Sequence, residues 1–203
     1  MKKGMYLSGA LASLLYIVAV IVGGILWPGY SHIRQSISEL TMTNSPVVKQ
    51  VGWMFALYNY LLLVFGVGMV GIWWKRNKLL AVSGIFLAVC SFAGIGMLSA
   101  TQDPLGASLT TKGLIHLILA GVASLTTLLA LFLAVFGFAR ENNRSLKNIS
   151  LIFATLVLIS GPITAMAIPQ IPDYFGLIER VTIGSFILWL LLVSGTLLVA
   201  ERT

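Results

Sequence analysis

The feature that most constrains this chain is a series of six long apolar stretches. Each reaches the roughly 20 residues that an α-helix needs to cross a hydrocarbon core of about 30 Å. The stretches cover residues 5–27, 51–74, 79–100, 113–139, 149–168 and 181–200. They are apolar on all sides, whereas the strands of a membrane barrel alternate apolar and polar residues. The sequence therefore predicts an all-α integral membrane protein, a single six-helix transmembrane bundle over residues 1–203.

The composition excludes an ordinary soluble domain. Hydrophobic residues make up 58% of the 203 residues and charged residues only 9%, and the mean hydropathy is +0.98. A soluble domain of this length carries many more charged residues on its surface. The first apolar stretch follows Lys2 and Lys3, as a secretory signal would, but it is longer than a signal core. We interpret it as the first membrane helix.

The distribution of basic residues predicts the orientation of the chain. Nine of the 13 basic residues lie at the chain ends and in the second and fourth connections: Lys2, Lys3, Lys75, Arg76, Lys78, Arg140, Arg144, Lys147 and Arg202. With two acidic residues, this side carries a net charge of +7, and the other side carries four charges of each sign. Because basic loops stay in the cytoplasm, we predict a multi-pass protein of the bacterial cytoplasmic membrane with both termini inside. The basic side fits anionic lipid rather than nucleic acid.

The first outer loop, residues 28–40, has the most informative pattern of any connection. Ile33, Ile37 and Leu40 recur at helical spacing, which predicts a short amphipathic helix lying on the membrane or on the bundle. Ser36 lies three residues before a glutamate, the spacing of a helix capping box.

Two interpretations of this loop remain open. It can be a structural lid whose polar side chains cap their own backbone, or a loop whose polar side chains line a site. The candidate ligand-binding residues at the outer side are Tyr30, His32, Arg34, Glu39, Asn59, Asp103, His116, Glu179 and Arg180. Asn59 lies at mid-depth, where an interhelical hydrogen bond is its expected role.

Carboxylates near an outer histidine are the candidates for chemistry. A neutral imidazole beside carboxylates can act as a general base or bind a metal, so His116, Asp103 and Glu39 are the candidate catalytic residues. The alternative is a structural network, for example ion pairs of Glu39 with Arg180 and of Asp103 with Lys112. The sequence requires no cofactor. It has no metalloprotease signature, and its two histidines alone are a weak signal for ligands of a metal or a haem.

Several short blocks, taken in order, carry a resemblance to a known family. They are Pro28-Gly29-Tyr30, Ile37-Ser38-Glu39-Leu40, Ser45-Pro46, Tyr58-Asn59, Asp103 ahead of His116, and Gly176 with Glu179-Arg180. In their order and spacing the chain resembles the bacterial family known as domain of unknown function 998. The resemblance covers nearly the whole chain. It implies a six-helix membrane protein and no assigned activity.

Three classes of function follow from these observations. The first is a membrane protein whose outward-facing polar pocket binds a small molecule, a lipid headgroup or a partner. The second is a membrane-embedded hydrolase of lipid or amide bonds that uses Asp103, His116 and Glu39, with or without a metal. The third is an accessory subunit that packs against another membrane protein and has no site.

Overall fold

The fold is entirely helical over the residues that the computed structural model describes, which are 2–104, 106–170 and 172–201. Its long helices are α1 (Lys2–Leu26), α2 (Val48–Trp73), α3 (Lys78–Ser99), α4 (Thr111–Arg140), α5 (Arg144–Gln170) and α6 (Phe175–Ala200). Two 3-10 turns, η1 (Ser38–Thr41) and η2 (Pro172–Tyr174), precede α2 and α6. All six long helices are long and apolar enough to cross a membrane, as the sequence predicted.

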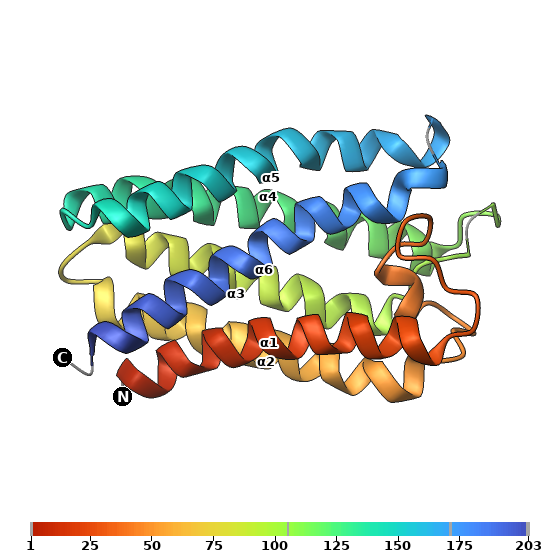
Figure 1. The fold of residues 1–203 in the computed structure, drawn as a ribbon, viewed down its shortest axis with the longest axis horizontal. Helices are drawn as coiled ribbons and strands as arrows, with labels where there is room; N and C mark the ends of the chain where they lie inside the picture. The colour runs from red at the N-terminus through yellow and green to blue at the C-terminus, as the bar shows by residue number, and fades with distance from the viewer. Residues whose placement is uncertain (1, 105, 171, 202–203) are drawn as a thin grey trace.

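The helices form a closed ring in which each packs on its neighbours in sequence and α1 packs on α6. The ring is flattened into two layers, with α1, α6 and α5 in one and α2, α3 and α4 in the other (Figure 1). Both termini lie at one end of the bundle (Figure 1). We call this end the terminal face, and the opposite end, formed by the connections after α1, α3 and α5, the loop face.

Close approach of α2 and α3 depends on small residues in both helices. A Cβ atom added to Gly66 would lie 2.8 Å from the backbone nitrogen of Ala88, and one added to Gly84 would lie 2.6 Å from the carbonyl oxygen of Gly66. Larger side chains fill the interior elsewhere, and the fully buried Trp189 donates a hydrogen bond of 2.9 Å to the hydroxyl of Ser150. Close contacts at small residues, like those of Gly66 and Gly84, are typical of helix packing in membranes, where the hydrophobic effect does not drive helices together.

All six helices begin before the predicted apolar stretches, and α5 and α6 differ most, by five and six residues. α5 begins at Arg144 instead of residue 149, where the side chain of Asn143 accepts a hydrogen bond of 3.0 Å from the backbone of Leu146. α6 begins at Phe175 instead of residue 181, directly after η2. Hydropathy marks the part of a helix inside the hydrocarbon, whereas capping and turns set where it begins. As a result Glu179 lies inside α6.

Candidate functional site

The first loop is attached to the beginning of α6 through its backbone. The carbonyl oxygen of Arg34 accepts a hydrogen bond of 3.2 Å from the amide of Gly176, and that of Ile33 accepts one of 2.9 Å from Leu177. The first amides of a helix have no partner within the helix, so the loop satisfies two of them. Gly176 permits the approach, because a Cβ atom there would lie 2.2 Å from the carbonyl oxygen of Gln35.

The guanidinium of Arg180, in α6, also binds the first loop. One terminal nitrogen donates to three carbonyl oxygens, those of His32 at 2.8 Å, Gln35 at 2.7 Å and Gly176 at 2.9 Å. The other donates to the hydroxyl of Tyr30 at 2.7 Å. The Nε atom is buried and has no hydrogen-bond partner among the described residues. Arginine suits this position because its planar group presents several donors in a fixed geometry.

Tyr30 connects the guanidinium to the backbone of the loop. Its hydroxyl donates a hydrogen bond of 2.6 Å to the carbonyl oxygen of Ser36. Burial raises the pKa of Tyr30 to about 12, against the neighbouring positive charge of Arg180, which lowers it. His32 packs edge-on against the Tyr30 ring at 5.2 Å, and burial, together with Arg180, lowers the pKa of its imidazole. Both side chains are therefore held in their neutral forms at neutral pH.

Glu39 forms the capping box that the sequence predicted. Its carboxylate accepts hydrogen bonds from the amide of Ser36 at 3.0 Å and from the side chain of Gln35 at 3.1 Å, while its own amide donates to the Ser36 hydroxyl at 3.2 Å. The helical segment here is the single 3-10 turn η1, shorter than the amphipathic helix that we expected. Ile37 is buried but Ile33 is 50% exposed, because the chain turns between them and its backbone bonds to α6.

Glu179 contributes a second buried carboxylate. It is 7% exposed and accepts a hydrogen bond of 2.5 Å from the backbone amide of Ile37. The predicted ion pair of Glu39 with Arg180 is wrong, because backbone carbonyls and a tyrosine hydroxyl take the donors of that guanidinium. We call this set the loop–α6 clasp; it consists of Tyr30, Gln35, Ser36, Glu39, Glu179 and Arg180.

Asp103 and His116 belong to a separate structure, the connection between α3 and α4. The carboxylate of Asp103 accepts hydrogen bonds from the amide and the hydroxyl of Thr110, each 2.8 Å long. The same hydroxyl caps α4 by accepting from the amide of Gly113 at 3.1 Å. The Nδ1 atom of His116 lies 2.9 Å from the carbonyl oxygen of Ala100, at the end of α3. Both side chains therefore hold the ends of two helices.

The remaining candidates also have local partners. Arg34 forms an exposed ion pair with Asp173 at 3.5 Å. The side chain of Asn59 donates to the carbonyl oxygen of Phe55 within α2, at 2.8 Å, and packs against Gly94 of α3. The expected interhelical bond at Asn59 comes from its backbone oxygen, which accepts from Ser91 of α3 at 2.7 Å.

The proposed catalytic set is not connected in the structure. Over residues 2–104, 106–170 and 172–201, no hydrogen bond or ion pair joins Glu39 to Asp103 or to His116. In the same residues no three of the histidine, cysteine and acidic side chains lie close enough together to hold a metal ion. The predicted pair of Asp103 with Lys112 is also not among the ion pairs of these described residues.

A depression of about 450 Å³ lies on the loop face where the first and third connections meet. Its lining residues are Thr43, Asn44, Asp103, Pro104, Thr110, Thr111 and Lys112. The two connections are joined by a hydrogen bond of 2.7 Å between the hydroxyls of Thr43 and Thr101. Of these residues, only Asp103 is a candidate site residue from the sequence. The first connection contributes Thr43 and Asn44, and a turn-forming run from Asn44 to Pro46 marks this part of the lining in the sequence. Asn44 has a positive φ of +67°, as asparagine in turns often does.

Comparison with known proteins assigns this chain to a family. No curated protein and no solved structure matches the chain. Residues 10–196 match the family model described as Protein of unknown function (DUF998). That match covers all of the loop–α6 clasp, the depression on the loop face and all six membrane helices except their outermost residues at the two chain ends. The chain belongs to the DUF998 family, as its sequence blocks indicated.

Proposed function

We propose that this protein binds a small polar molecule or a lipid headgroup in the depression on its loop face. The observation that carries the proposal is the chemistry of the lining, in which Asp103 and Lys112 stand with three threonine hydroxyls and one amide. Lys112 forms no hydrogen bond or ion pair among the described residues, whereas Asp103 is held by Thr110. A ligand that carries both an anionic group and an amine matches a free ammonium beside a fixed carboxylate.

The geometry favours binding over hydrolysis. Hydrolysis requires a base that is free to take a proton from water. One ring nitrogen of His116 faces the carbonyl oxygen of Ala100, and both oxygens of Asp103 accept hydrogen bonds from Thr110. The loop–α6 clasp likewise directs its polar groups to backbone atoms. None of the clasp residues lines the depression, so the clasp contributes to the proposal only by holding the first loop in place.

Isothermal titration calorimetry of the detergent-purified protein tests the proposal, with glycerophosphoethanolamine as the probe. We expect saturable binding that weakens about tenfold in Lys112→Gln, the loss of one charge-assisted contact. Lys49→Gln is the matched control, because Lys49 is also exposed on the loop face and does not line the depression. Absence of binding both to the probe and to phosphatidylethanolamine vesicles, or equal weakening in both variants, would contradict the proposal. Binding of phosphatidylethanolamine vesicles alone, lost in Lys112→Gln, would identify the ligand as a lipid.

We also propose that the loop face is outside the cytoplasmic membrane and the terminal face inside. The support is the net charge of +7 on the terminal side and zero on the other. Cys90, the single cysteine, is buried, so introduced cysteines can be labelled selectively. A membrane-impermeant maleimide added to intact cells should label Ser108→Cys and leave Lys3→Cys unlabelled. The reverse pattern would place the depression in the cytoplasm.

A further inference from the structure

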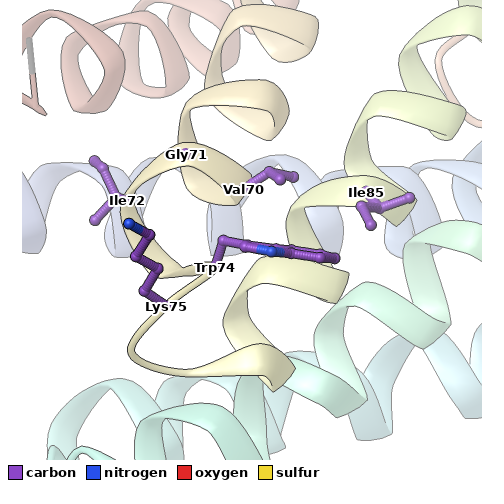
Figure 2. Close-up of a pocket in the computed structure, with 6 residues that line it drawn as sticks. All are labelled: Val70, Gly71, Ile72, Trp74, Lys75 and Ile85. Carbon is purple, nitrogen blue, oxygen red and sulfur yellow. The ribbon is translucent and has the colours of Figure 1, made fainter.

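A second concave surface lies at the opposite end of the molecule, between α2 and α3. It has a volume of about 660 Å³ and is lined by Val70, Gly71, Ile72, Trp74, Lys75 and Ile85. Figure 2 shows the Trp74 ring reaching from the end of α2 toward Ile85 of α3. Five of the six lining residues are apolar, and Trp74 and Ile85 are exposed on the flank of the bundle. Such a groove in a membrane helix pair contacts acyl chains.

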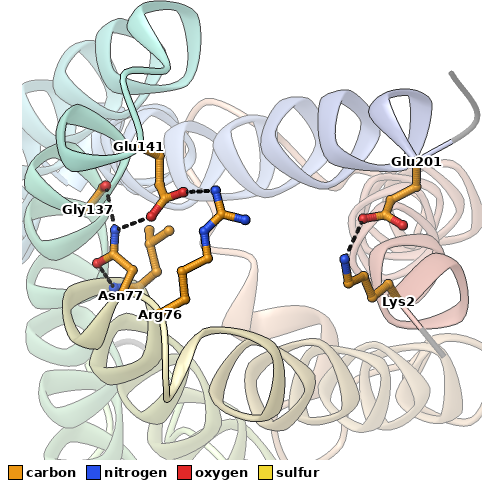
Figure 3. Close-up of polar contacts among 7 residues, drawn as sticks. Lys2, Arg76, Asn77, Gly137, Glu141 and Glu201 are labelled. Atoms are coloured by element: carbon orange, nitrogen blue, oxygen red, sulfur yellow. Dashed lines mark hydrogen bonds and ion pairs between the residues drawn. The ribbon is translucent and has the colours of Figure 1, made fainter.

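The basic side chains at this groove have no acidic partner. The terminal face has two acids, and both are already paired in Figure 3: Glu201 with Lys2 at 3.1 Å, and Glu141 with Arg76. Lys75 forms no ion pair among the described residues, and neither does Lys78, whose ammonium lies 3.7 Å from the centre of the Trp74 ring. The apolar groove therefore opens beside two uncompensated positive charges.

The groove extends from the basic end of the helix pair toward the apolar middle of α3. Ile85 follows Lys78 by seven residues in α3, which places it about 10 Å deeper along the helix. A tryptophan at the end of a membrane helix is typical of the headgroup level, and lysine side chains there reach toward the phosphates. The charge at the top and the apolar wall below are the two halves of a phospholipid site.

We propose that this groove binds an anionic glycerophospholipid, whose phosphate contacts Lys75 and Lys78 and whose acyl chain lies along Val70 and Ile85. The occupant follows from charge complementarity, because a zwitterionic lipid would leave the two positive charges of the lysines uncompensated. The site is separate from the depression on the loop face, and neither proposal depends on the other.

Gly71 offers a direct way to fill the groove without disturbing the fold. A Cβ atom at Gly71 meets no atom within 4 Å, so a side chain there extends into open space. Leucine also favours a helix more than glycine does. Gly71→Leu should therefore fold and should block the acyl chain. Gly121→Leu is the matched control, since Gly121 of α4 is also exposed with no atom within 4 Å of a Cβ.

Quenching of tryptophan fluorescence tests the proposal, with the protein reconstituted in phosphatidylcholine vesicles. Brominated phosphatidylglycerol is the probe, and brominated phosphatidylcholine is the comparison lipid. We expect quenching by the anionic lipid to saturate at a low mole fraction. Loss of both lysine charges in the Lys75→Gln/Lys78→Gln variant should weaken that binding about 30-fold.

The variants distinguish a specific site from general contact with lipid. Gly71→Leu should lose the saturable quenching, whereas Gly121→Leu and the charge control Lys3→Gln/Arg144→Gln should retain it. Trp74→Phe should lose most of the saturable signal if Trp74 reports the site. Equal quenching by the two brominated lipids, quenching that rises linearly with mole fraction, or unchanged binding in Gly71→Leu would each overturn the proposal.

Discussion

The charges of α6 in the loop–α6 clasp and the ion pair between the two chain ends are held in different ways. On the loop face, Arg180 and Glu179 are bonded to backbone groups of the first loop. On the terminal face, Lys2 and Glu201 form an ion pair whose side chains are 53% and 32% exposed (Figure 3). When one member of a buried pair is removed, the group that remains has no hydrogen-bond partner. In an exposed pair, water takes the place of the lost partner. We therefore expect charge to matter more for stability in the loop–α6 clasp, on the face that has no net charge, than in this exposed pair.

The largest effect should come from replacing Arg180. Arg180→Met removes the donors to the carbonyl oxygens of His32 and Gln35 and to the hydroxyl of Tyr30, two of which are partly buried and lose that partner. We expect the free energy of unfolding, measured by denaturant titration in detergent micelles, to fall by about 3 kcal/mol. Arg34→Met is the control, because Arg34 is exposed in its pair with Asp173. Equal losses in both variants would break the contrast between buried and exposed charges.

The next effect tests the backbone contact of the clasp without removing a charge. Gly176→Ala introduces a Cβ atom 2.2 Å from the carbonyl oxygen of Gln35, so the loop must move away from α6. We expect a loss of about 1–3 kcal/mol, as for other overpacked sites, and faster proteolysis of residues 28–40. Gly184→Ala lies in the same helix with no atom within 4 Å of its Cβ. That control should be neutral or slightly stabilising, and a loss comparable to that of Gly176→Ala would contradict the close approach.

A smaller effect should appear at alkaline pH through Tyr30. The pKa of Tyr30 rises to about 12 in the folded protein, against about 10 in an unfolded chain. Between these values the unfolded state releases a proton that the folded state keeps, so the free energy of unfolding falls as pH rises from 10 toward 12. The contribution is complete below pH 10.

Tyr30→Phe should remove this part of the pH dependence. Its unfolding free energy should decline less steeply than that of the wild type between pH 10 and 12, measured by the same denaturant titration. The exposed Tyr60 provides the comparison in Tyr60→Phe, whose curve should follow the wild type. Identical slopes in the wild type and Tyr30→Phe would mean that burial does not raise the pKa of the Tyr30 hydroxyl in the folded protein.

The sequence predicted those features that depend on local pattern. Apolar length alone identifies all six helices, because a segment in lipid must satisfy its own backbone hydrogen bonds. The capping box of Ser36 and Glu39 is confirmed for the same reason, since both partners lie within one turn. Glu39 and Glu141 also lie at opposite ends of the bundle, on the loop face and the terminal face.

The partners of Arg180 and Asp103 could not be predicted in the same way. An ion pair of Arg180 with Glu39 is one example of the structural network that the sequence left open. The partners of Arg180 are instead mainly carbonyl oxygens, which every residue has and no sequence pattern marks. Asp103 was grouped with Glu39 because both lie on one face, yet it bonds to Thr110, seven residues away in its own connection. Shared depth in a membrane does not imply contact, because the helices in between decide which ends meet.

The smallest effect should come from the exposed pair of Lys2 with Glu201, which links α1 to the end of α6. A double-mutant cycle of Lys2→Ala and Glu201→Ala should give a coupling energy of about 0.5 kcal/mol or less, and the coupling should vanish at 1 M salt. The pair of Arg76 with Glu141 should couple more strongly, because Glu141 is only 13% exposed and also accepts from Asn77 at 3.0 Å. If the Lys2 cycle exceeded the loss in Arg180→Met, exposure would not be the variable that separates the two faces. The packing of α1 on α6 would then depend mainly on the ion pair at the terminal face. The first loop would contribute little to the stability of the helix ring.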